Sequence, residues 1–85
     1  MRNEAAAIIT ALETGNFLLS VHAVRRMRQR SVTKADIEAC GRTATACICQ
    51  PERGTYRVDG KDLDGEPLTV VCGIDDEEII IVTLF

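Results

Sequence analysis

A chain of 85 residues that is 46% hydrophobic and 27% charged has the composition of one globular domain, which argues against a disordered or fibrous protein. Its net charge of −3 argues against a uniformly basic nucleic-acid binder, and no stretch approaches the ~20 apolar residues that cross a membrane. We expect a single domain over residues 1–85, located in the cytoplasm because no secretory signal is evident.

The first predicted element is a helix over residues 3–14. Apolar residues recur there at i, i+3, i+4 and i+7, the pattern of one buried helix face, and they are Ala5, Ile8, Ile9 and Leu12. Gly15 follows at a position where glycine commonly ends a helix, because it adopts the left-handed conformation without a Cβ clash. A short apolar step over residues 17–19 then leads to the second element.

Two further helices are predicted before residue 43. Ser20 can cap a helix that runs to Arg30, since its hydroxyl can accept from a free amide of the first turn. Thr33 and Asp36 have the spacing of a capping box, which begins a third helix that ends at about residue 43. The residues expected to face inward are Val21, Ala23, Val24 and Met27 in the second helix, and Ile37 with Cys40 or Gly41 in the third.

The C-terminal half predicts an antiparallel meander. Residues 54–58, 68–74 and 79–85 are rich in strand-forming side chains and are separated by polar turns. Residues 79–82 do not alternate between apolar and polar side chains, so we expect the last strand to be central and covered on both faces. Residues 46–49 fit either a strand or a helix tail. The expected fold is α+β, with two to three helices packed on three or four antiparallel strands.

The second helix carries a group of polar residues on one side. Helical spacing places His22, Arg25, Arg26, Gln29 and Arg30 together, and no acidic residue lies within that helix to offset the repulsion between the cations. Phosphate groups, or carboxylates from another element, would remove this repulsion. Eight carboxylates between residues 59 and 78 are candidates for the second role.

These residue types suit the cleavage of RNA by internal transesterification. His22 could act as base or acid, while Arg26 and Arg30 would stabilise the developing phosphate charge. Tyr56 or Arg57 could complete the site if the sheet faces the helix. Ser20, Arg25 and Gln29 are the candidate phosphate-binding residues, and the chemistry requires neither a metal nor another cofactor.

Structural roles compete with each of these interpretations. The arginine-rich side could be a solvated face or could form ion pairs, His22 could bond a backbone carbonyl, and Tyr56 alternates with Val58 as a packing residue would. Cys47 and Cys49 have the wrong spacing for a zinc knuckle, and the other two cysteines fit core positions. The acidic run over residues 75–78 fits a solvated turn.

The stretch SVHAVRRMRQRSVTKADIE, residues 20–38, together with YRVDGKD, LTVVCGI and IIIVTLF, resembles the bacterial family called domain of unknown function 4258. The resemblance covers about residues 18–85 and assigns motif positions to Ser20, His22, Arg26, Met27 and Arg30, with Asp36 in the capping role. It implies small cytoplasmic proteins, many encoded beside zinc-finger proteins that resemble antitoxins. It also implies a relation to RelE-type toxin ribonucleases, with a helix pair on a curved antiparallel sheet.

Two functional hypotheses follow. The first is a toxin-like endoribonuclease of a toxin–antitoxin system, with RNA as substrate and a small antitoxin protein as partner. The alternative is a non-catalytic module that binds a protein, RNA or a second copy of the chain. Neither hypothesis involves a membrane.

Overall fold

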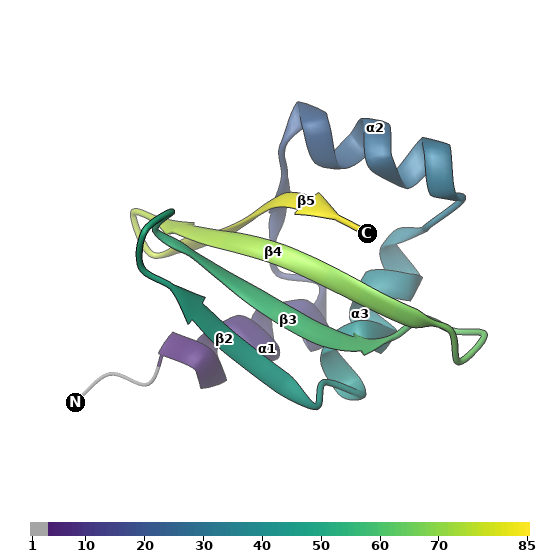
Figure 1. The fold of residues 1–85 in the computed structure, drawn as a ribbon, viewed down its shortest axis with the longest axis horizontal. Coiled ribbons are helices and arrows are strands. Elements are labelled where there is room, and N and C mark those ends of the chain that lie inside the picture. The colour runs from purple at the N-terminus through teal and green to yellow at the C-terminus, as the bar shows by residue number, and fades with distance from the viewer. Residues whose placement is uncertain (1–3) are drawn as a thin grey trace.

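The computed structural model describes residues 4–85, which form a sheet with helices behind it and at one edge (Figure 1). Three helices and five strands follow one another over residues 4–85. Their bounds are α1 Glu4–Thr14, β1 Leu18–Leu19, α2 Val21–Arg30, α3 Lys34–Arg42, β2 Ala46–Gln50, β3 Thr55–Lys61, β4 Pro67–Asp75 and β5 Glu78–Leu84. Asn3, the expected first residue of α1, lies outside the described residues.

The sheet has the strand order β1-β5-β4-β3-β2 and is mixed. Strands β2 to β5 form the expected antiparallel meander, whereas β1 pairs parallel to β5 through Leu18 opposite Ile80 and Leu19 opposite Ile81. The expectation of three or four antiparallel strands was therefore incomplete. Residues 46–50 are a strand, and the short apolar step after α1 supplies a fifth one.

The predicted helix ends are confirmed by their hydrogen bonds. The Ser20 hydroxyl accepts from the Ala23 amide at 3.0 Å, which caps α2. At α3, the Thr33 hydroxyl accepts from the Asp36 amide at 3.2 Å and the Asp36 carboxylate accepts from the Thr33 amide at 2.9 Å, so both halves of the capping box are present. Gly15, with a φ of +75°, follows α1 and adopts the left-handed conformation expected of it.

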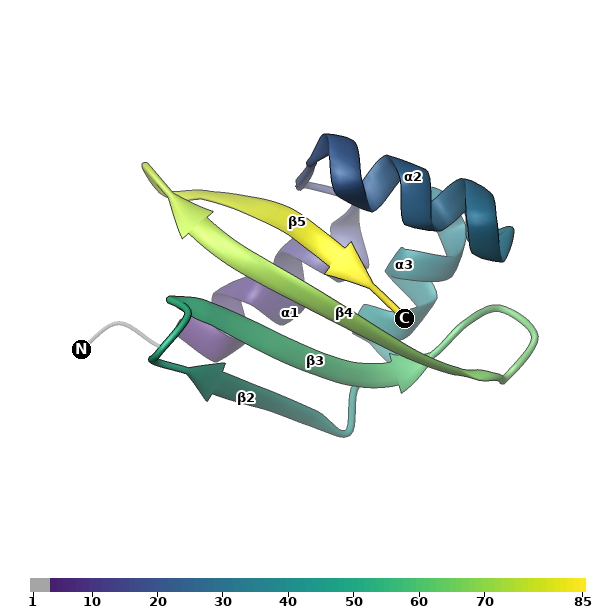
Figure 2. The same cartoon turned by 45° about the horizontal axis from the view of Figure 1, so that its top comes forward.

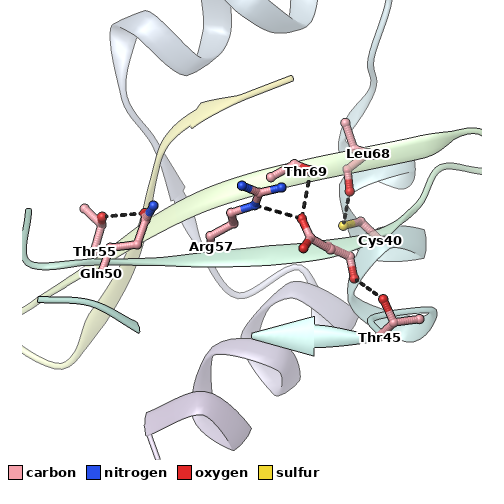
Figure 3. Close-up of polar contacts among 8 residues, drawn as sticks. Cys40, Thr45, Gln50, Thr55, Arg57, Leu68 and Thr69 are labelled. Atoms are coloured by element: carbon pink, nitrogen blue, oxygen red, sulfur yellow. Dashed lines mark hydrogen bonds and ion pairs between the residues drawn. The ribbon is translucent and has the colours of Figure 1, made fainter. Parts of the chain in front are cut away.

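The core lies between the sheet and the helices α1 and α3, which cover one face of the sheet (Figure 2). It is aliphatic, and the fully buried side chains include Ile8, Leu12, Ile37, Val58, Val70, Ile81 and Leu84. Cys40 and Cys72 are buried in it as expected, and the Cys40 thiol donates to the Leu68 carbonyl at 3.3 Å (Figure 3).

The opposite face of the sheet, which we call the open face, is not covered by any helix of residues 4–85 (Figures 1 and 2). Val82 of β5 is consequently 38% exposed, so the expectation that this strand would be covered on both faces was wrong. Val21 was also expected to face inward but is 73% exposed. Helix α2 packs beside β5 through a narrow stripe centred on the fully buried Ala23, which leaves Val21 outside the contact.

Candidate nucleic-acid interface

Ser20 joins the start of α2 to the edge of the sheet. Its amide donates to the Ile81 carbonyl at 3.0 Å and its hydroxyl donates to the Val82 carbonyl at 2.8 Å. The same hydroxyl oxygen caps α2 by accepting from Ala23. Because this oxygen already has one donor and one acceptor within the protein, Ser20 positions the helix, and its hydroxyl hydrogen is committed to Val82.

Arg26 continues this edge contact six residues further along the chain, more than one helical turn after Ser20. Its Nε donates to the Leu84 carbonyl at 3.2 Å, near the end of β5. Strand β1 pairs with β5 only as far as Ile81, so α2 takes the place of a neighbouring strand beyond that point. The two side chains Ser20 and Arg26 thereby supply donors to β5 carbonyls that would otherwise face solvent at the sheet edge.

The other polar residues of α2 are directed to solvent. Arg25, Arg28, Gln29 and Arg30 are exposed, and so is His22 in the first turn. Within residues 4–85, the one ion pair joins Arg57 to Asp59, and no described carboxylate lies within ion-pair distance of an α2 arginine. We call His22, Arg25, Arg26, Gln29 and Arg30 the α2 polar surface. Its cations are not neutralised by the acidic second half of the described chain.

Tyr56 and Arg57 lie on opposite faces of the sheet, because successive strand residues alternate. Tyr56 packs against the core on the helix side, beside Glu4 and Cys49, where desolvation and the Glu4 carboxylate raise the pKa of its phenol. Strand β4 and strand β5 separate it from α2. The structure therefore does not bring Tyr56 together with His22.

Arg57 lies on the open face in an oriented cluster (Figure 3). Its Nε donates to Asp59 Oδ1 at 3.1 Å, Thr69 Oγ1 donates to the same oxygen at 2.9 Å, and the guanidinium lies 5.9 Å from the centre of the Phe85 ring. Partial burial opposes ionisation of Asp59, but the hydrogen bonds from Arg57 and Thr69 outweigh it and lower the pKa of the carboxyl. The guanidinium is thus held in place while its side chain remains 43% exposed.

The open face also carries exposed apolar side chains. Ile48 of β2 is 51% exposed and Phe85, which follows β5, is 45% exposed. Phe85 follows Leu84, whose carbonyl binds Arg26, so the α2 polar surface and the open face meet at the end of β5. Sequence reasoning missed Phe85, Asp59 and Thr69. The two-residue period of β3 was the available signal, because it places Arg57 and Asp59 on one face.

A separate groove of about 740 Å³ lies between α1 and the turn that joins β4 to β5. It is lined in part by Thr10, Phe17, Leu18 and Glu78, and none of the predicted site residues borders it. Among residues 4–85 no three His, Cys, Asp or Glu side chains are grouped to hold a metal ion. No helix in the same range is long and apolar enough to span a membrane.

Comparison with known proteins identifies one family. A family model described as "Domain of unknown function (DUF4258)" matches residues 19–85. Searches of curated proteins and of solved structures returned no match. The matched region begins at the second residue of β1 and includes α2, the sheet and Phe85, and it covers well over half of the chain. The chain therefore belongs to the DUF4258 family.

Proposed function

We propose that the protein binds RNA through the α2 polar surface and cleaves it as a toxin-like endoribonuclease. The observation that supports this proposal is the group of α2 cations that no described carboxylate neutralises. Like charges one turn apart repel each other on a helix, and phosphate groups of RNA would relieve that repulsion. RNA as substrate fits a cytoplasmic protein.

Different residues would contact the phosphates of RNA, position α2 and stack with bases. Arg25, Gln29 and Arg30 are exposed and can reach phosphate oxygens, with Arg guanidinium groups binding them bidentately. Ser20 and Arg26 hold α2 against β5 through their hydrogen bonds to β5 carbonyls. On the open face, Phe85 and the oriented Arg57 suit stacking with unpaired bases.

The proposed reaction needs one titrating group beside these cations. His22 accepts the proton of a ribose 2′-hydroxyl, and the oxygen forms a bond to the adjacent phosphorus. The bond from phosphorus to the 5′-oxygen then breaks, and that oxygen takes a proton from the imidazolium or from water. The products are a 2′,3′-cyclic phosphate and a 5′-hydroxyl end. Arg26 and Arg30 stabilise the charge of the pentavalent intermediate.

The family resemblance supports the biological setting of this proposal. It suggests a fold related to that of RelE-type toxin ribonucleases and a small antitoxin protein as the natural inhibitor. The helix pair α2–α3 followed by an antiparallel meander is compatible with that relation. Such a toxin would act on RNA in the cell until its partner covers the α2 polar surface.

The activity is tested by incubating purified protein with single-stranded RNA, alone and in a translation extract. We expect wild type to release 5′-hydroxyl ends and His22→Ala to be at least about 100-fold slower, the usual contribution of a general base. Arg42→Ala, at an exposed position of α3, is the control and should cleave normally. Equal rates for wild type and His22→Ala, with matching melting curves, would refute catalysis by His22.

A second candidate function is binding to an acidic protein segment without catalysis. Val21 of α2 is 73% exposed, so an exposed apolar side chain accompanies the cations of that helix. An amphipathic segment with carboxylates would fit both features. If this is the function, Val21→Asp should weaken binding of the partner encoded next to the gene while leaving any affinity for short RNA unchanged. If Val21→Asp instead weakens binding of short RNA and leaves binding of the partner unchanged, RNA is favoured as the ligand.

A further inference from the structure

Strand β2 forms an edge of the sheet whose outer side is not covered by any described strand. In the order β1-β5-β4-β3-β2 it has β3 as its only described neighbour. An edge strand presents unpaired N–H and C=O groups, and proteins usually protect such edges with lysine, proline or a charge directed inward. The five residues Ala46–Gln50 contain none of these protective residues.

The two faces of β2 differ in their side chains. Ile48 pairs with Arg57 on the open face and is 51% exposed. Cys47 and Cys49 point to the helix side, where Cys47 packs against the core and Cys49 is exposed. Both thiols are free. The segment therefore presents one apolar residue on one face and two thiols on the other.

The central three residues of β2, Cys47-Ile48-Cys49, are symmetric about Ile48. If a second copy pairs antiparallel with this strand around Ile48, each Ile48 lies opposite the other, each Cys47 lies opposite Cys49 of the second copy, and each Ala46 lies opposite Gln50. A register centred on one residue also places the outward N–H and C=O groups of one strand opposite the outward groups of the other. All opposed side chains are neutral, so no like charges meet.

The charges on the open face next to this edge are compatible with a second copy. Arg57, the residue of β3 that pairs with Ile48, forms an ion pair with Asp59. On the open face the charges beside Ile48 are therefore balanced, so they do not repel a second copy of the chain. An identical strand also gains apolar contact between the two Ile48 side chains, each 51% exposed in the single chain.

We propose that two copies of the chain associate through antiparallel pairing of their β2 strands, centred on Ile48. The dimer has a two-fold axis through that residue and a continuous sheet across the two copies. Cys47 of each copy then lies beside Cys49 of the other on the helix side. This proposal does not rest on the proposed RNA binding, whose phosphate contacts lie on α2 at the opposite edge of the sheet from β2.

Sedimentation at increasing concentration tests the association itself. Wild type should convert from monomer to dimer, and Ile48→Lys should remain a monomer because two ammonium groups would face each other across the axis. Leu63→Lys is the matched control, since Leu63 is 58% exposed in the turn between β3 and β4. It should dimerise like wild type. A wild type that stays monomeric, or an Ile48→Lys variant that dimerises equally, would overturn the proposal.

Oxidation with diamide tests the register. Each cross-link joins Sγ of Cys47 to Sγ of Cys49 from the other copy, and the two thiol hydrogens with their electrons reduce diamide to the hydrazine. Wild type should give a covalent dimer on a non-reducing gel. Cys47→Ser and Cys49→Ser should each give almost none, because each retains only one thiol of the pair.

Mixing the two variants distinguishes this register from random collision. Heterodimers of Cys47→Ser with Cys49→Ser place the remaining Cys49 opposite the remaining Cys47, so about half of the wild-type cross-linking should return in an equimolar mixture. Mass spectrometry should identify the Cys47–Cys49 link. Efficient cross-linking of Cys47→Ser alone would show that two exposed Cys49 thiols meet, and that result would contradict the register.

Discussion

Arg26 donates from Nε to the Leu84 carbonyl at 3.2 Å, and this contact ties the middle of α2 to the end of β5. It gives the arginine a structural role in addition to its place on the α2 polar surface. The bond spans 58 positions in the sequence, so it forms only when α2 and β5 dock. Arg26 and Ser20 together fix how the polar surface is presented.

The first prediction concerns this contact. Arg26→Ala should lower the free energy of unfolding by about 1 to 2 kcal/mol, because a partly buried carbonyl loses a charged donor. Urea denaturation measures the change. Arg28→Ala, at an exposed position of the same helix, should change stability by less than about 0.5 kcal/mol. Equal destabilisation by both substitutions would show that the Leu84 contact is not what holds α2.

The second prediction concerns Gly60 in β3, where α3 approaches the sheet closely. A Cβ built on Gly60 would clash with the Cys40 carbonyl oxygen, which is rigid backbone. Gly60→Ala should therefore destabilise the protein by about 2 kcal/mol or more, since α3 must move away from the sheet. Gly73→Ala is the control, because the nearest atom, Cγ2 of Val82, lies 3.9 Å away. Thermal melting of both variants gives the comparison.

The third prediction is a pH dependence set by Asp36. Hydrogen bonds from the Thr33 and Leu63 amides lower the pKa of the Asp36 carboxyl, although partial burial opposes them. A lowered pKa in the folded state means that the stabilisation is present above the unfolded value of 3.8 and is lost as the pH falls through the folded value.

Asp36→Asn checks this dependence. The variant should be about 1 kcal/mol less stable than wild type near neutral pH, the usual magnitude of a capping interaction. The difference should shrink as the pH is lowered below 4 in urea titrations, because wild type then loses the same interaction. A difference that stays constant down to the acid limit would assign the effect to something other than the ionised carboxylate.

The fourth prediction concerns the order in which thiols react. Burial raises the pKa of Cys40 to about 11 and that of Cys72 to about 12, so neither forms a thiolate at neutral pH. Desolvation also raises the pKa of Cys47, while Cys49 is exposed. Iodoacetamide should modify Cys49 first and Cys72 only after unfolding. Mass spectrometry of timed samples would show the order, and early modification of Cys72 would contradict its burial.

Local signals in the sequence were sufficient for most elements. Capping residues at Ser20, Thr33 and Asp36 fix where α2 and α3 begin, and these ends were predicted correctly. Strand β1 could not be predicted, because Leu18 and Leu19 are too few for a periodic pattern and their parallel partner lies in β5. The exposure of Val21 depends on how narrowly α2 contacts β5, which periodicity does not determine.

The candidate site was predictable only in part, because some of its contacts form only when distant segments of the chain pack together. The shared side of His22, Arg25 and Arg30 follows from helical spacing alone. The contacts of Ser20 and Arg26 with β5 carbonyls depend on tertiary docking. Sequence reasoning gave Ser20 a capping role and gave both residues a role in ligand chemistry, but it did not predict these contacts. The choice between Tyr56 and Arg57 depends on which face of β3 is buried, and this became clear only once α1 and α3 were placed.

The salt dependence of RNA binding tests the central claim most directly, using fluorescence anisotropy with a short single-stranded RNA. We predict that Arg25→Ala with Arg30→Ala weakens binding and reduces the slope of log affinity against log salt by about 1.4, or roughly 0.7 for each lost phosphate contact. Arg42→Ala with Arg53→Ala removes the same charge from exposed positions outside α2 and should leave the slope near the wild-type value. Equal slopes for the two double variants, or no RNA binding by wild type, would contradict a phosphate-binding role for α2.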